Sequence, residues 1–320
     1  MSTSPDDNTS STSNTSGTAD EEPWAAFRRS LLDDGILLVT GVDGIYGRSA
    51  TYESIIEAVD RISAAAGADL GAVNLRFPPV MPWATFEKNG YLESFPDQMG
   101  SVHTFRGDER AHAELLRRTE AHEDRGPLLE TTDIVLCPAA CHALYPTQSG
   151  TLPEGGKHFE VFGYCFRHEP STDPFRMQSF RMHEFVYLGT EEGARAHRDE
   201  WISRGIDVLT GLGLEVESVV ANDPFFGRPG RMLAANQRSE ELKFEIVTPV
   251  FATRRETAIS SSNCHLDHFS RPFEIYTADG ELAHSACFGF GVDRITLALL
   301  DHHGTDPTAW PAAVRSVLWP

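Results

Sequence analysis

Two strand-like stretches, residues 159–168 and 180–188, constrain the fold of this chain more than any other feature. The eleven residues between them, 169–179, are polar and rich in Pro, Ser, Asp and Arg. Two apolar stretches joined in this way predict an antiparallel hairpin with a long loop. Long loops on a rigid sheet often carry function. Further strands are expected at residues 73–77, 215–220, 243–247 and 283–289.

Helical spacing of apolar residues predicts helices at residues 53–66 and 192–209, and a closing helix is expected at residues 291–300. Strands that pair mostly by hairpins, with helices between them, indicate an α+β fold built on an antiparallel sheet. Residues 1–22 are almost all small, polar or acidic and cannot bury enough apolar surface to offset their ordering entropy. We therefore expect a disordered tail at residues 1–22 and folded sequence over residues 23–320.

The overall composition limits the cellular compartment and the binding partners that can be expected for this chain. No apolar run approaches the roughly 20 residues of a membrane helix, and the N-terminus lacks the basic and apolar regions of a signal peptide. Five scattered cysteines, an odd number, favour free thiols over a disulfide framework. The sequence therefore predicts a cytoplasmic protein. Its formal net charge of −20 disfavours tRNA as a partner, because phosphate neutralisation dominates nucleic-acid affinity.

Two segments have the residue types of a nucleotide site. On the predicted hairpin, Arg167 could clamp a phosphate and an aromatic residue of the neighbouring strand could stack under a purine. Solvated charges beside core aromatics would give the same pattern. Further on, glycines precede Arg294 where a predicted strand turns into a helix, and such helix N-termini favour anions. A tight strand–helix junction explains those glycines equally well.

Taken together and in this order, the two segments resemble motifs 2 and 3 of class II aminoacyl-tRNA synthetases. Residues 181–185 look like the seryl-enzyme pattern Arg-x-His-Gln-Phe, with Glu184 in place of Gln, and residues 75–79 fit a loose motif 1. Longer runs resemble the amino acid:[carrier protein] ligases, truncated relatives of the atypical, zinc-containing seryl-tRNA synthetases. These runs are residues 76–100, 138–146 and 262–269, and the resemblance covers roughly residues 50–300.

The resemblance implies the class II catalytic fold over residues 23–320, an antiparallel β-sheet flanked by helices. It also implies a homodimer through motif 1 and the use of ATP. By resemblance, Arg167 contacts the α-phosphate and the substrate carboxylate, and Glu169 reads the adenine amino group. Phe185 is expected to stack on the base and Arg294 to hold the γ-phosphate.

The same resemblance implies two metals. Mg²⁺ is expected to bridge the phosphates, with Glu245 or Glu256 as its carboxylate. Zn²⁺ is expected on Glu184, Cys287 and a first cysteine that is either Cys141, which we favour, or Cys137. From spacing alone these cysteines could equally be small buried hydrophobes, since no CxxC pair is present.

Three protein ligands with an open fourth position are typical of a functional zinc site. A substrate amine in that position leaves little room for a bulky side chain, which favours glycine or alanine, with serine next. The His-Leu-Asp-His segment at residues 265–268 is expected to shape the substrate pocket or to pack locally rather than to bind metal.

The predicted function is activation of a small amino acid as its adenylate, followed by transfer to the phosphopantetheine thiol of a carrier protein. A tRNA acceptor is disfavoured, since only about 30 folded residues precede the first predicted helix and leave no room for a tRNA-binding domain. The alternatives are a minimal tRNA-charging synthetase and a synthetase-like binding protein that has lost catalysis. The presence of Arg167, Arg294, Glu184 and Cys287 favours an active enzyme.

Overall fold

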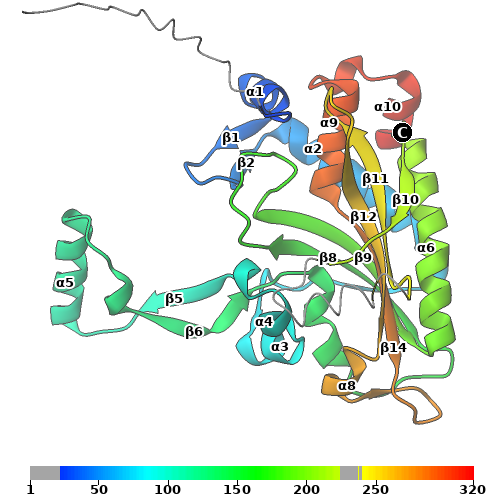
Figure 1. The fold of residues 1–320 in the computed structure, drawn as a ribbon, viewed down its shortest axis with the longest axis horizontal. Helices are drawn as coiled ribbons and strands as arrows, with labels where there is room; N and C mark the ends of the chain where they lie inside the picture. Colours follow the sequence, from blue (N-terminus) through cyan, green and yellow to red (C-terminus); the bar gives the residue numbers. More distant parts are fainter. Residues whose placement is uncertain (1–21, 224–236, 238–239) are drawn as a thin grey trace, which may run out of the picture.

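The computed structural model describes residues 22–223, 237 and 240–320, so the predicted tail lies outside the described residues apart from Glu22. A seven-stranded sheet, in the order β10-β11-β12-β14-β9-β8-β3, forms the body (Figure 1). All neighbouring strands are antiparallel except β3 and β8, which are parallel. The strands are β3 (Val73–Leu75), β8 (Lys157–Phe166), β9 (Ser179–Gly189), β10 (Glu217–Val220), β11 (Lys243–Val250), β12 (Arg255–Leu266) and β14 (His284–Phe290).

The predicted hairpin is present: β8 and β9 pair from Lys157↔Leu188 to Phe166↔Ser179, and the polar loop joins them. The predicted α+β fold with an antiparallel sheet flanked by helices is therefore confirmed. One central strand, β12, was not predicted. Its run of Ser and Asn lacks the apolar alternation of a strand, although it pairs with both β11 and β14.

Three long helices, α2 (Ala50–Ala66), α6 (Glu191–Gly211) and α9 (Val292–His303), bury their apolar residues in one core. Trp201 of α6 lies at its centre, with ring centroids 4.0 Å from Phe185 of β9 and 5.3 Å from Phe288 of β14. The side chains of Ser49 and Thr190 cap the N-termini of α2 and α6. These contacts fix one face of the sheet against helices and leave the other face for a site.

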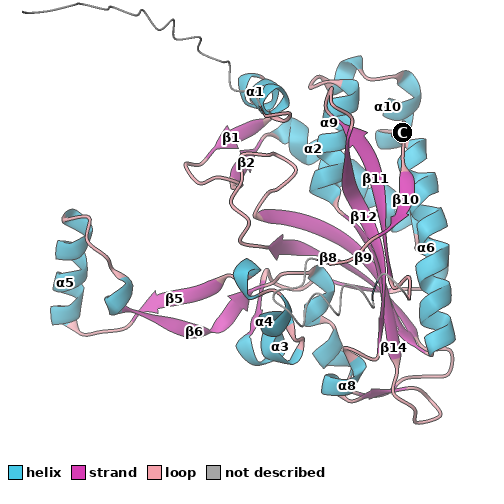
Figure 2. Cartoon of the chain, in the orientation of Figure 1, coloured by secondary structure: helices cyan, strands magenta, loops and turns pink. Residues whose placement is uncertain are grey.

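Shorter elements surround that second face, in the lower part of Figure 2. They include the short helices α3 (Trp83–Lys88), α4 (Tyr91–Ser94) and α8 (Ser270–Phe273), the 3₁₀ turns η4 (Ala140–Ala143) and η5 (Tyr145–Gln148), and the strands β7 (Gly150–Thr151) and β13 (Ile275–Tyr276). A smaller apolar cluster, which includes Tyr145, Phe159 and Phe269, holds them to the sheet.

Two further groups of elements flank the body. The N-terminal group comprises α1 (Ala25–Asp33), β1 (Leu37–Val39) and β2 (Tyr46–Arg48), and the chain closes on α10 (Ala312–Leu318). An arm projects to the left in Figure 1; it carries β5 (Ser101–Phe105), α5 (Glu109–Glu120) and β6 (Leu129–Leu136), and β4 (Val80–Pro82) pairs with β6. Among the described residues, no helix combines the length and the apolar composition needed to cross a lipid bilayer.

Candidate active site

The cavity on the open face of the sheet is built by strand alternation. One row of paired residues crosses four strands: Glu245 of β11, Ser261 of β12, Gly289 of β14 and Glu184 of β9. Because successive side chains of a strand point to opposite faces, this row faces away from the helical core. All four residues line a cavity of about 860 Å³. The loop between β8 and β9, the turn η4 and the short helix α4 form its other walls.

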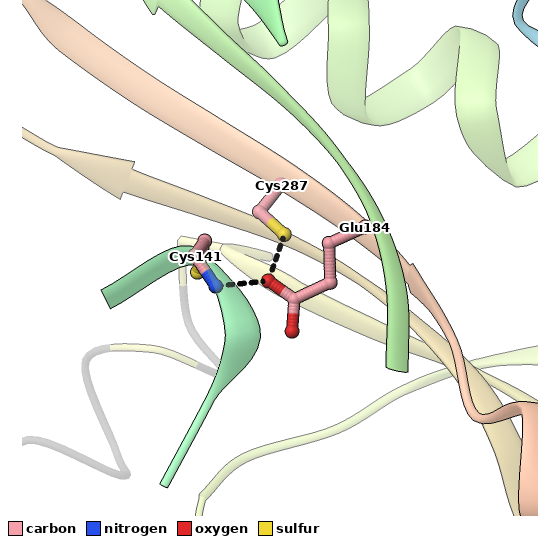
Figure 3. A group of neighbouring side chains, drawn as sticks. All are labelled: Cys141, Glu184 and Cys287. Atoms are coloured by element: carbon pink, nitrogen blue, oxygen red, sulfur yellow. Dashed lines mark hydrogen bonds between the residues drawn. The ribbon is translucent and has the colours of Figure 1, made fainter. Parts of the chain in front are cut away.

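Cys141, Glu184 and Cys287 form a compact group (Figure 3), and all three line this cavity. Their potential ligand atoms all lie within 4.8 Å of one another, and all three residues are buried. The backbone N–H groups of Ala140 and Cys141 donate to the Glu184 carboxylate at 3.2 and 2.9 Å, which fixes its orientation. The Cys287 thiol donates to Glu184 Oε2 at 3.5 Å.

The structure brings Cys141, rather than Cys137, into this group. The Cys137 thiol donates to the carbonyl of Ala139 at 3.0 Å and lies outside the three-residue set. In the metal-free group, the hydrogen bond with Cys141 and burial raise the pKa of Cys287 well above its usual range. Two thiols and one carboxylate, buried but open to a cavity, are the donor set of a zinc site with one free position, so these residues fit zinc.

Two arginines line the same cavity: Arg167 follows strand β8, and Arg294 lies in the first turn of α9. The Nε of Arg167 donates to the carbonyl of Pro138 at 3.2 Å, and its guanidinium lies 5.5 Å from the ring centroid of Phe180. Arg294 donates from Nε to Phe175 O at 3.0 Å and from Nη1 to Ala258 O at 2.9 Å. Burial, and then the nearby charge of Arg167, lower the pKa of Arg294.

Neither arginine is ion-paired with a carboxylate of the described residues. Their cationic heads are instead held by backbone carbonyls. Each of these partly buried guanidiniums still has N–H donors for an anionic ligand, and phosphate and carboxylate oxygens are suitable acceptors.

Three predicted carboxylates also line the cavity. Glu169 lies 3.5 Å from Nη1 of Arg176, and Glu245 lies 3.1 Å from Nζ of Lys243. Glu256 reaches the cavity because of a bulge in β12: Ile246 pairs with Ser260 but Val247 pairs with Ala258, which leaves Ile259 as an extra residue. The bulge returns Glu256 to the face of Ser261, from which an unbroken strand would turn it away.

Comparison with known proteins identifies the family. The chain matches no protein-family model. It is 42% identical over 301 residues to amino acid–[acyl-carrier-protein] ligase 1 of Bradyrhizobium diazoefficiens, across 93% of this chain and 92% of that one. The chain belongs to the amino acid–[acyl-carrier-protein] ligase family. It is therefore a ligase, and the family predicted from the sequence motifs is confirmed.

More distant relatives and solved structures agree with this fold. The ligase is 28% identical over 269 residues to the type-2 serine–tRNA ligase of Methanopyrus kandleri, over 77% of this chain but 50% of that one. The M. kandleri seryl-tRNA synthetase, solved in complex with an A. aeolicus tRNASec, superposes with a TM-score of 0.76 at 21% identity. That superposition covers 93% of this chain and 60% of the synthetase, and it confirms the class II aminoacyl-tRNA synthetase fold.

Phe185 does not lie at the predicted position in the structure of the ligase. Phe185 is 1% exposed, stacks on Trp201 in the helical core and does not line the cavity. The prediction that it stacks on adenine is therefore wrong. Strand alternation explains the error, because Glu184 faces the cavity and the next residue must face the opposite side. Phe180, four residues before Glu184, is the strand aromatic that lines the cavity beside Arg167.

The alternation of side chains between the two faces of β9 would identify Phe180 from the sequence alone. Once Glu184 is assigned to a metal, residues of even number on that strand share its face, and Phe180 is the aromatic among them. The histidines predicted to shape the pocket also line the cavity of the ligase. His265 Nδ1 lies 3.1 Å from Ser285 Oγ, and His268 Nε2 lies 3.1 Å from the carbonyl of Asn89.

Proposed function

We propose that this ligase activates a small amino acid with ATP and passes the aminoacyl group to the phosphopantetheine thiol of a carrier protein. The observation that carries the proposal is one cavity lined both by Arg167 and Arg294, which have no carboxylate partner within the described residues, and by the group of Cys141, Glu184 and Cys287. The first pair suits a polyphosphate and the second group an amino acid amine. On this proposal, residues 23–320 act as one catalytic domain.

In the first half-reaction, a carboxylate oxygen of the amino acid forms a bond to the α-phosphorus of ATP. The bond from that phosphorus to the bridging oxygen breaks, and pyrophosphate leaves with the electron pair. Arg167 aligns the α-phosphate and the carboxylate, and Arg294 holds the γ-phosphate, so both act by positioning and by charge stabilisation. Phe180 stacks on the adenine, and Glu169 accepts a hydrogen bond from its amino group.

Two metals fit this arrangement. Glu245 and Glu256 line the cavity and would hold Mg²⁺, which neutralises charge on the phosphates when bound. Cys141, Glu184 and Cys287 would hold Zn²⁺, which when bound would supply a Lewis acid for an unprotonated α-amine. An amine held there would lie beside these three buried side chains at the cavity wall. Such a position would leave little room for a bulky side chain, and we therefore propose glycine or alanine as substrate, with serine next.

In the second half-reaction, the acceptor thiol attacks the acyl carbonyl, and AMP leaves as the thioester forms. The names of the two Bradyrhizobium relatives support a carrier protein as acceptor. The formal charge of −20 opposes a tRNA partner. We also propose a homodimer through β3, which ends the sheet and leaves Val73 46% exposed. Five free, buried cysteines are consistent with the reducing cytoplasm.

Intact-mass spectrometry tests the proposal directly. Zinc-loaded enzyme, ATP, Mg²⁺ and one amino acid at a time would be mixed with a phosphopantetheinylated carrier protein or with bulk tRNA. The expected result is a carrier mass gain of one glycyl or alanyl group with tRNA left uncharged. Charged tRNA with an unmodified carrier would refute the acceptor. Activation of only a large amino acid would refute the substrate class.

A further inference from the structure

Asp173, in the loop between β8 and β9, is a buried carboxylate that no part of the proposed chemistry requires. It is 1% exposed. Its Oδ2 lies 2.9 Å from Nη1 of Arg255 at the start of β12, and its Oδ1 accepts from the backbone N–H of Phe175 at 3.0 Å. One carboxylate therefore ties the motif 2 loop to a strand of the central sheet and also sets the local course of that loop.

The residue that Asp173 fixes is the one that holds Arg294. The carbonyl of Phe175 accepts from Nε of Arg294 at 3.0 Å, while Nη1 of the same guanidinium is held by Ala258 O at 2.9 Å. Ala258 lies three residues beyond Arg255 on the same strand. Both carbonyls that orient the Arg294 head thus belong to segments that the Asp173–Arg255 pair joins.

The N-terminal helix packs behind this pair. The guanidinium of Arg255 lies 4.8 Å from the ring centroid of Phe251 and 5.8 Å from that of Trp24. Trp24 also donates from Nε1 to Thr172 Oγ1 at 3.3 Å. Phe27 of α1 packs on Phe251 at a ring distance of 5.8 Å. Two aromatic rings and one carboxylate therefore hold Arg255, which is 33% exposed and also lines the cavity.

An ion pair in this position is poorly explained by stability alone. The loss of hydration of a buried carboxylate offsets much of its attraction to an arginine, and apolar replacements of such pairs are often as stable. The pair instead fixes the position of the Asp173 carboxylate, because a charged partner and an N–H donor hold it from two sides.

We propose that Asp173 is a positioning residue for ATP: through Arg255 and the carbonyl of Phe175, it sets Arg294 for the terminal phosphates. The inference rests on the proposed function, in which Arg294 contacts the γ-phosphate. The inference predicts that the affinity for some ligands changes and the affinity for others does not. Loss of Asp173 should weaken ligands that carry the β- and γ-phosphates and should spare ligands that end at the α-phosphate position.

The test compares two ligands on Asp173→Asn. Asn keeps an acceptor for the Phe175 N–H but removes the charge that Arg255 pairs with. Isothermal titration would measure the Kd of a non-hydrolysable ATP analogue and of an aminoacyl-sulfamoyl adenosine, which has no β- or γ-phosphate. We expect the Kd of the ATP analogue to rise by about tenfold or more, and that of the sulfamoyl adenosine to change by less than about twofold. In pyrophosphate exchange, KM for ATP should rise more than KM for the amino acid.

A neighbouring ion pair provides the matched control. Arg254 pairs with Glu215 at 2.8 Å, but their side chains are 65% and 67% exposed. Glu215→Gln should therefore leave both Kd values unchanged. Arg255→Lys gives a second variant, since it keeps the charge while losing the planar contact with the rings. It should show the same selective loss, smaller in size, even if Asp173→Asn does not fold.

The outcomes separate the two proposals. Equal weakening of both ligands, or no weakening, would refute the positioning role of Asp173 and leave the function intact. A wild-type enzyme that binds neither ligand would overturn the proposed function and this inference with it.

Discussion

Asp293, in the first turn of α9, accepts a hydrogen bond from the backbone N–H of Arg181 at 2.6 Å and another from its Nη2 at 3.1 Å. The two side chains are 2% and 5% exposed. Tyr52 donates to the same carboxylate at 2.9 Å, and Arg48 Nε lies 3.1 Å from it. A single buried carboxylate thus locks the motif 3 helix to the motif 2 strand, directly beside Arg294.

Asp293→Asn should destabilise the fold strongly, since it leaves the buried charges of Arg181 and Arg48 without their shared partner. Removal of one member of a buried ion pair costs about 3–5 kcal/mol of unfolding free energy. Urea denaturation followed by circular dichroism measures it. Asp69→Asn is the control, because Asp69 is 63% exposed in its pair with Arg204 and exposed ion pairs contribute little to stability. Similar losses in the two variants would contradict the prediction.

Phe180→Ala should affect ATP binding, whereas Phe185→Ala should affect the stability of the fold. Phe180 lines the cavity, so its loss should raise KM for ATP by about tenfold, as expected for one base stacked on an aromatic ring. Phe185 is buried against Trp201, so its loss should cost about 3–5 kcal/mol of stability. Steady-state kinetics and urea denaturation measure the two effects.

A second ligand makes the Phe180 prediction specific. Inhibition by tripolyphosphate, which has no base, should be unchanged in Phe180→Ala because the arginines remain. A matched rise in its inhibition constant would indicate general damage to the cavity rather than a lost stacking partner.

The sequence predicted the parts of this ligase whose signals are local. The hairpin of β8 and β9 followed from two apolar stretches and a polar loop, and the long helices from their apolar spacing. The arginines and the acidic residues of the motifs followed from resemblance, and the structure places them around one cavity. Strand β12 was not predicted because Ser residues lie on both of its faces and hide the apolar alternation of a strand, whereas its pairing with β11 and β14 is visible only in the structure.

The remaining differences have a common cause in strand geometry. Phe185 was assigned to the same site as Glu184 although consecutive residues of a strand cannot share a face. The position of Glu256 at the cavity depends on a bulge at Ile259, which no local sequence pattern reveals. Residues such as Asp173 become visible only when a loop and a distant strand meet, since nothing in their own segment marks them.

His197 of α6 should make the stability of the ligase depend on pH. It is 4% exposed, and burial lowers its pKa from 6.5 to about 3. Between these values the unfolded chain binds a proton that the native state does not, so the unfolding free energy falls as pH falls from about 6.5 toward 3. Between pH 7 and 5 this one group should remove about 2 kcal/mol.

Urea denaturation of His197→Gln at pH 7 and pH 5 isolates that contribution. Gln keeps a donor for the carbonyl of Phe185, which accepts from His197 Nε2 at 3.0 Å, but it does not titrate. The variant should lose about 2 kcal/mol less than the wild type over this interval. His302→Gln, at an exposed position of α9, should follow the wild-type slope. Identical slopes in all three proteins would contradict the assignment to His197.

Zinc content should separate the two candidate first ligands. Cys141→Ser should reduce the bound metal from about one zinc per chain to a small fraction, because Cys141 is the cysteine grouped with Glu184 and Cys287. Cys137→Ser, at an equally buried position four residues away, should keep its zinc and serves as the control. Elemental analysis after dialysis measures both. Zinc affinity should also rise with pH, since zinc must displace a proton from Cys287, whose pKa is raised by Cys141 and by burial. Loss of zinc from Cys137→Ser but not from Cys141→Ser would reverse the assignment.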